Sequence, residues 1–217
     1  MITAKHKKIW ELFFILYAKI NLKRIYREIR LYHVKDRYDS ACIETDKPII
    51  LISNHFSFWD GFIHLLLNRS LFNKRVYIMM LYKQLSIRRF LRYGGCFSVE
   101  PGKKSVFETL RYCSSILKNS SNLLLIFPQG EIESLYVDDY SFRSGVERIA
   151  SEANSADIYF NINLINFFSN KRPTMTIYYK KYNPQGEGDE TLESAYNKFA
   201  SECRSLESKE VKGVKIL

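Results

Sequence analysis

A histidine and an aspartate five residues apart are the clearest candidates for chemistry in the sequence. His55 follows the apolar run 48–53, and Asp60 stands near the start of a predicted helix. A tight turn can bring the carboxylate onto one ring nitrogen of His55 and leave the other nitrogen facing a cleft. That arrangement suits a general base, because the carboxylate fixes the tautomer and stabilises the imidazolium. Such a histidine can take a proton from an alcohol that attacks a carbonyl carbon.

The same spacing has a simpler explanation, in which His55 makes local hydrogen bonds and Asp60 caps the helix. The spacing alone occurs often by chance in chains of this length and is therefore weak evidence. Its position directly after a predicted strand strengthens the catalytic interpretation. His64 lies beside an apolar helix face, and we interpret it as structural. His6 and His33 lie in basic segments and carry no signal. No cluster of metal ligands stands out, so no metal is expected.

A second polar turn follows another apolar run, at residues 123–127. The turn consists of Phe127, Pro128, Gln129, Gly130 and Glu131. Proline stops a strand ladder and glycine permits a sharp turn. Functional side chains of α/β folds collect beyond the carboxyl ends of the strands, so we expect this turn to share a sheet edge with the first. The alternative is an ordinary strand-to-loop turn.

Strand-like and helical patterns alternate along the chain. They predict an α/β fold with a mixed, largely parallel sheet flanked by helices. We expect strands at 48–53, 76–80, 96–99, 123–127, 158–168 and 174–182. We expect helices at 61–71, 84–93, 105–118, 145–153 and 190–207. One α/β domain should cover residues 38–217, without an internal repeat or linker.

Residues 1–37 are predicted to form an amphipathic helical segment at the membrane interface. Apolar residues recur at helical spacing from Ile15 to Ile29, while lysines and arginines line another face. The apolar stretch 10–18 is too short to span a bilayer, so the helix would lie in the interface plane. The alternative is a helix that packs on the core with a solvated basic face. The expected membrane-binding residues are Trp10, Phe13, Phe14, Lys19, Lys23 and Arg27, with Arg30 beside them.

Composition narrows the class of partner. The 217 residues are 46% apolar, which excludes a disordered chain, and they carry 33 Lys and Arg against 23 Asp and Glu. The basic residues gather in the first half among bulky apolar ones, which suits an anionic membrane surface. A nucleic-acid partner is the competing explanation of the net charge of +10, but no recognition motif is present. Scattered cysteines and the absence of a signal peptide favour the cytoplasmic face of a membrane, with peripheral or monotopic attachment.

Three blocks together resemble the glycerolipid acyltransferase family, which includes the lysophosphatidic acid acyltransferases. They are Asn54-His55-x4-Asp60, the step Gly95-Cys96-Phe97, and Phe127-Pro128-x-Gly130. The resemblance covers roughly residues 45–165 and implies acyl transfer from acyl-CoA or acyl-carrier protein to a hydroxyl of a lipid acceptor at a membrane surface, without a further cofactor. It implies that His55 is the general base and Asp60 its partner. The expected substrate-binding residues are Asn54, Ser57, Phe97, Lys103, Phe127, Pro128, Gln129, Gly130, Glu131 and Arg143.

The third block departs from the family's usual Phe-Pro-Glu-Gly-Thr-Arg-Ser. Gln129 replaces the acid, Ile132 replaces the arginine, and Glu131 and Glu133 add negative charge. A site that loses an arginine and gains carboxylates is worse for a phosphate dianion. We therefore expect a neutral or zwitterionic hydroxylated lipid to be acylated faster than lysophosphatidic acid. Three basic residues could rebuild a phosphate site from other positions: Lys103, Lys104 and Arg143.

Two other functions on the same fold stay open. A lipid-binding protein that lost turnover would account for the altered third block, although the intact His55 and Asp60 argue against it. A thioesterase would release free fatty acid in the absence of an acceptor. Consumption of an acyl thioester with and without an acceptor separates both from an acyltransferase.

Overall fold

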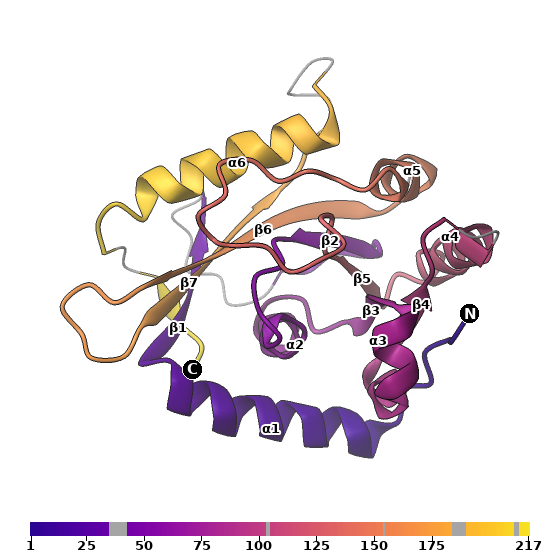
Figure 1. The fold of residues 1–217 in the computed structure, drawn as a ribbon, viewed down its shortest axis with the longest axis horizontal. Helices are drawn as coiled ribbons and strands as arrows, with labels where there is room; N and C mark the ends of the chain where they lie inside the picture. Colours follow the sequence, from indigo (N-terminus) through magenta and orange to yellow (C-terminus); the bar gives the residue numbers. More distant parts are fainter. Residues whose placement is uncertain (35–42, 103–104, 154, 184–189, 211–212) are drawn as a thin grey trace.

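In a computed structural model of the protein, one mixed sheet lies between two layers of helices (Figure 1). The structure describes residues 1–34, 43–102, 105–153, 155–183, 190–210 and 213–217. Its strands are β1 (Glu28–His33), β2 (Ile49–Ser53), β3 (Arg75–Leu81), β4 (Cys96–Val99), β5 (Asn122–Ile126), β6 (Asp157–Asn166), β7 (Thr174–Lys181) and β8 (Val214–Lys215). They are ordered β4-β3-β5-β2-β6-β7-β1-β8 across the sheet.

The sheet is largely parallel, as the sequence predicts. From β4 to β6 every neighbouring pair of strands runs in parallel. The pairing of β6 with β7 is antiparallel, since a short turn joins them, and β1 then pairs in parallel with β7. The short strand β8, which the sequence pattern does not reveal, closes the edge in antiparallel pairing with β1.

The central strand β2 is covered on both faces, which explains its unbroken apolar run. Ile49 and Leu51 pack toward the layer of α1, α2 and α3, whereas Ile50 and Ile52 pack toward α4, α5 and α6. Figure 1 shows α1 and α6 on opposite sides of the sheet. The helices are α1 (Lys8–Ile25), α2 (Asp60–Leu71), α3 (Tyr82–Ile87), α4 (Ser105–Ile116), α5 (Gly145–Glu152) and α6 (Leu192–Leu206).

The predicted helical segment 1–37 is correct for Lys8–Ile25 and wrong for residues 1–7 and 26–34. Tyr26 is already extended, and the Arg27 N–H donates to the Pro173 carbonyl, at 2.8 Å. From Glu28 the chain forms β1, where Ile29 is buried in the sheet. Ile29 fits a helical spacing after Ile25, but the burial of Ile29 and Leu31 on either side of the half-buried Arg30 has the period of a strand. The first 37 residues thus contribute a strand to the same sheet.

The basic stretch predicted as one helix at 84–93 is divided. Helix α3 ends at Ile87, and a 3₁₀ helix, η1 (Arg89–Gly94), follows. Gly95 ends η1 with a φ of 103°, and a Cβ there would lie 2.1 Å from the Val76 carbonyl oxygen, so a glycine is required. No helix within the described ranges is long and apolar enough to cross a bilayer.

Candidate active site

The turn after β2 brings His55 and Asp60 together. Nδ1 of His55 lies 2.7 Å from Oδ2 of Asp60, which is fully buried at the first residue of α2. The same oxygen accepts the backbone N–H groups of Phe56 (2.8 Å) and Ser57 (2.9 Å). These donors belong to the turn and not to the helix, so Asp60 does not act as the helix cap that the simpler explanation required. Burial and the negative charge of Asp60 raise the pKa of Tyr26 to about 12.

The imidazole of His55 is held on two sides. Its ring stacks on Phe127, with centroids 4.4 Å apart and planes 19° apart, and Asp60 fixes Nδ1. The side chain is 23% exposed, and no described residue hydrogen-bonds Nε2. Since Nδ1 donates its proton to the carboxylate, the neutral ring presents Nε2 as a proton acceptor.

The turn after β5 binds the backbone of His55 directly. Oε1 of the buried Gln129 accepts the His55 N–H at 2.7 Å, and Nε2 of Gln129 donates to the Glu133 carboxylate at 2.8 Å. The Glu133 N–H donates in turn to the His55 carbonyl, at 2.9 Å. Glu133 was not among the predicted site residues, and its only signal in the sequence was an added charge. The two turns therefore meet at one sheet edge, as expected.

Two residues of the first turn serve to fix it. Asn54 is fully buried, and its amide accepts the Asn163 N–H (2.9 Å) and donates to the Asn163 carbonyl (3.1 Å). This pair of hydrogen bonds ties the turn to β6. Ser57 donates its N–H to Asp60 and accepts the Trp59 N–H with Oγ, at 3.0 Å. The described hydrogen bonds of both side chains support the backbone of the turn.

The predicted phosphate-binding Arg143 supports the second turn and is paired with an acid. Its backbone N–H donates to the Pro128 carbonyl (2.9 Å), and its Nε donates to the Gln129 carbonyl (3.0 Å). The guanidinium also donates to the exposed Glu131 carboxylate at 2.8 Å. Gly130 has a φ of 77° and lies against the Arg143 side chain. Glu131 thus offsets the cation that could replace the family's arginine.

One predicted substrate residue, Phe97, is not brought to this edge. Phe97 is fully buried in β4, where its ring contacts Tyr112 at 5.1 Å between centroids. Strand β4 is separated from β2 by two strands, so Phe97 supports the core instead of touching a substrate at His55. Lys103 lies outside the described residues, as does Lys104.

His64 has the structural role that the sequence suggested. It is buried one helical turn after Asp60, with Nδ1 2.7 Å from the Asp60 carbonyl and Nε2 2.7 Å from Oδ1 of Asn161. Burial lowers the pKa of His64, while the hydrogen bonds to the Asp60 carbonyl and to Asn161 raise it. The ring thereby links the start of α2 to strand β6 beneath the turn of residues 54–60.

The sequence predicts apolar and basic residues on different sides of α1. In the structure, both kinds of residue lie on its outward face. Lys19 and Lys23 are exposed on the same side of the helix as a row of exposed apolar residues. That row, which we call the outward row of α1, consists of Ile9, Leu12, Phe13, Leu16, Tyr17 and Ile20. Two predicted membrane residues do not belong to it. Phe14 is buried against α2, and Trp10 stacks on Tyr93 at 5.7 Å between ring centroids.

Arg27, another predicted membrane residue, lies beyond α1 and is paired. Its guanidinium is 3.6 Å from Glu28 and 3.8 Å from Glu210. Arg30 donates to the same two carboxylates, at 2.6 Å and 3.0 Å. These cations are compensated within the fold because β1 carries them past the end of the helix.

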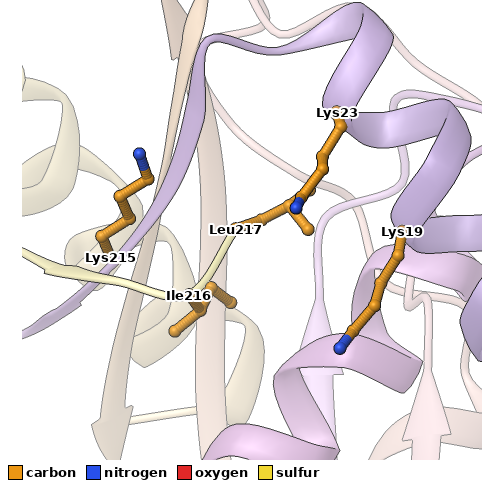
Figure 2. A pocket seen from close by; sticks show the side chains of 5 residues that line it. All are labelled: Lys19, Lys23, Lys215, Ile216 and Leu217. Atoms are coloured by element: carbon orange, nitrogen blue, oxygen red, sulfur yellow. The ribbon is translucent and has the colours of Figure 1, made fainter.

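A basic hollow of about 290 Å³ lies at the C-terminal end of α1. Figure 2 shows Lys19 and Lys23 reaching from the helix toward Ile216 and Leu217, with Lys215 on the other side of the C-terminal segment. The hollow shares no residue with the turns of residues 54–60 and 127–133. Its lysines add positive charge beside the outward row of α1.

Comparison with known proteins identifies a family and a similar solved structure. Residues 33–178 match the family model described as Acyltransferase. The crystal structure of the 1-acyl-sn-glycerophosphate (LPA) acyltransferase PlsC from Thermotoga maritima is similar, with a TM-score of 0.56 and 17% sequence identity. The match covers 93% of this chain and 81% of that one. No curated protein matches the sequence at the significance applied.

Proposed function

Because this chain belongs to the acyltransferase family, we propose that it moves a fatty acyl group from an acyl thioester to a hydroxyl group of a lipid at a membrane surface. The observation that carries the proposal is the contact of 2.7 Å between His55 and the buried carboxylate of Asp60. This contact leaves one ring nitrogen as a base at the sheet edge where ligands of α/β folds bind.

The reaction follows from the position of that nitrogen. Nε2 of His55 removes the proton of the acceptor hydroxyl as its oxygen attacks the thioester carbonyl carbon, and a tetrahedral intermediate forms. The Asp60 carboxylate, held by three donors, stabilises the imidazolium. Collapse of the intermediate breaks the carbon–sulfur bond, and the imidazolium returns its proton to the departing thiolate. The products are an ester and a free thiol.

The alcohol is expected to attack the thioester directly, because the described cysteines are poorly suited to act as the nucleophile. Cys96, Cys113 and Cys203 are buried, and burial raises the pKa of the Cys96 and Cys113 thiols to about 12. A thiol with such a pKa is a poor nucleophile at neutral pH. We therefore propose a ternary complex of enzyme, thioester and acceptor, with acyl-CoA or acyl-carrier protein as donor and no further cofactor or metal.

The acceptor we propose is a hydroxylated lipid with a neutral or zwitterionic headgroup. The support is the ion pair of Arg143 with Glu131, at 2.8 Å, which uses the described cation nearest the second turn. Gln129 is also occupied, by the His55 N–H and by Glu133. A phosphate dianion would have to compete with Glu131 for the guanidinium.

We propose that α1 attaches the protein to the cytoplasmic face of an anionic membrane as a peripheral or monotopic element. Its support is the outward row of α1 beside Lys19, Lys23 and the hollow of Figure 2. Apolar residues flanked by lysines suit the headgroup layer of such a membrane. Since β1 belongs to the sheet, removal of residues 1–37 would damage the fold, and point substitutions such as Leu16→Glu are the sharper test.

An acceptor screen tests the proposed reaction. Purified protein is incubated with labelled acyl-CoA or acyl-carrier protein and a set of hydroxylated lipids, and the products are identified by lipid mass. We expect an acylated lipid that forms only with the parent protein and not with His55→Ala. Release of free fatty acid without an acceptor would instead indicate a thioesterase, and lipid binding without turnover would indicate an inactive binding protein.

A further inference from the structure

The segment α3–η1, residues 82–94, shares an aromatic cluster with α1. Trp10 contacts Phe90 at 6.1 Å between ring centroids and stacks on Tyr93 at 5.7 Å. Phe14 contacts Phe90 from below, at 6.2 Å. The ammonium of Lys7 lies 4.5 Å from the Tyr93 ring centroid. These contacts make α1 and α3–η1 neighbours on one face of the molecule, in agreement with Figure 1.

Two apolar side chains of α3–η1 are exposed to solvent. Ile87 is 79% exposed and Phe90 is 44% exposed. Phe90 is continuous with the outward row of α1, because Trp10 contacts both Phe90 and Phe13. Exposed apolar patches of this extent mark interaction sites in soluble proteins.

Ile87, Phe90 and the outward row of α1 form one exposed apolar patch. At the end away from η1, this patch reaches the turn of residues 54–60. Phe13 stacks on Tyr17 (6.2 Å), and Tyr17 stacks on Trp59 (5.8 Å), which precedes Asp60. Phe58, three residues after His55, contacts Trp59 at 5.5 Å and is 56% exposed. A series of ring contacts therefore runs from η1 across α1 to the loop that carries the base.

The excess of positive charge around the patch indicates an anionic partner. Residues 8–25 and 82–94 contain eight lysines and arginines against one acid, Glu11, which is paired with His6. Lys83 and Arg89 are exposed, and no described acid forms an ion pair with either. Apolar side chains surrounded by uncompensated cations match an anionic lipid layer, in which acyl chains meet the apolar atoms and phosphates meet the cations.

We propose that α3–η1, the outward row of α1 and Phe58 form one lipid-contact surface, with Ile87 and Phe90 as a second point of attachment. This inference rests on the proposed membrane function and adds a segment and an orientation to it. A single helix lets a protein rotate about the helix axis on the membrane. Two attachment points fix the orientation, and Phe58 then holds the turn of His55 at the interface where a lipid hydroxyl lies.

Co-sedimentation with vesicles of phosphatidylcholine and phosphatidylglycerol in equal parts tests the second attachment point. We expect Ile87→Glu to weaken binding by about tenfold or more, because the isoleucine no longer buries its apolar surface and a carboxylate faces the lipid phosphates. Arg89→Gln should weaken binding by about fivefold, the effect of one cation near an anionic surface. Phe167→Glu and Lys198→Gln, at exposed positions on the β6–β7 turn and on α6, are the matched controls and should bind as the parent does.

A fluorescent probe gives a second measurement that does not depend on weakened binding. Acrylodan is attached to Ile87→Cys, or to Phe167→Cys as a control, in a Cys42→Ser background. The described cysteines are buried and should not react. On addition of the vesicles we expect a blue shift of the emission at position 87 and none at position 167, because only the first probe enters the lipid.

The reference variant Leu16→Glu separates the two proposals. If Leu16→Glu detaches the protein while Ile87→Glu binds as the parent does, α1 attaches the protein alone and the second attachment point is wrong. If Leu16→Glu also binds normally, the proposed membrane docking fails as a whole. Self-association of the parent without lipid, abolished by Ile87→Glu, would show that the patch is covered by a second copy of the chain and would also overturn the inference.

Discussion

The two turns that form the candidate site are built in different ways. The turn of residues 54–60 closes on itself, because Asp60 binds the imidazole and two N–H groups of the same turn. The turn of residues 127–133 depends on partners elsewhere, since Gln129 binds His55 and Arg143 binds the carbonyls of Pro128 and Gln129. The first turn keeps the residues of the family pattern, and the second replaces several of them.

This difference suggests that the first turn serves the proposed reaction and the second turn serves the choice of acceptor. Proton transfer needs one histidine and one carboxylate in contact, and both of these side chains belong to the first turn. The second turn can change its charge as long as it still accepts the His55 N–H. Gln129 does so with an amide oxygen, and the carboxylate lies four residues later, at Glu133. Acceptor charge can therefore vary without loss of the base.

The strongest test of the first turn is removal of the base. We expect His55→Ala to lower the rate of acyl transfer by about 10²- to 10⁴-fold, because general-base catalysis contributes this much. The fold should persist, since the ring is partly exposed and the hydrogen bonds of the His55 backbone to Gln129 and Glu133 do not involve it. Initial rates and circular dichroism measure the two effects. A folded variant with the parent rate would contradict the proposed mechanism.

The self-contained nature of the first turn can be tested through Asp60→Asn. A single oxygen of Asp60, Oδ2, contacts Nδ1 of His55 and accepts the N–H groups of Phe56 and Ser57, so an asparagine oxygen in its place can keep all three contacts but carries no charge. The imidazolium that forms on proton transfer would then lose the carboxylate that stabilises it. We expect a loss of about 10²-fold or more in kcat with a much smaller change in KM. A change confined to KM would show that Asp60 acts only in binding.

The family pattern has a glutamate where this chain has Gln129. Because Gln129 depends on its contact with Glu133, we predict that Gln129→Glu lowers activity in this protein. Gln129→Glu would place a carboxylate where the amide now donates to Glu133 at 2.8 Å. Two carboxylates so close raise the pKa of one of them, so the contact survives only while they share a proton. We expect kcat/KM to fall by up to about 10²-fold, through displacement of His55, and the loss to grow with rising pH.

Exchange of the two residues provides the control. Glu133→Gln keeps an acceptor for the Gln129 amide and should change activity little. In the double variant Gln129→Glu/Glu133→Gln, the new amide can donate to the new carboxylate, and kcat/KM should recover with a flat pH dependence. A double variant as impaired as Gln129→Glu would show that the charge at position 129, and not the pairing with Glu133, limits activity.

The fold could be predicted to the extent that each element had one consistent period. The buried run of β2 and the amphipathic patterns of α2, α4, α5 and α6 gave correct types and nearly correct bounds. The pattern failed at β1, because Ile25 and Ile29 fit a helix while Ile29 and Leu31 fit a strand. Pairing with β7 decided between the two, and such a long-range contact leaves no local signal. The two residues of β8 were too few for any pattern.

The site could be predicted where a residue acts through its neighbours in sequence. The contact between His55 and Asp60 follows from a tight turn after a buried strand. The partners of Gln129, Asn54 and Arg143 lie on other elements, so their roles as supports of the backbone were not visible. Phe97 matched a family step but points into the core, because burial depends on which face of β4 is covered.

The smallest expected effect concerns the ion pair of the second turn, and it tests whether that turn sets the acceptor charge. Glu131→Gln would free the Arg143 guanidinium, now 2.8 Å from the carboxylate. The pair is exposed, so kcat/KM for lysophosphatidic acid relative to a neutral hydroxylated lipid should rise only about two- to fivefold. Glu152→Gln, which breaks the similar pair with Arg148 on α5, is the matched control and should leave the ratio unchanged. A preference for lysophosphatidic acid in the parent that Arg143→Ala abolishes would mean that this arginine already binds phosphate despite Glu131.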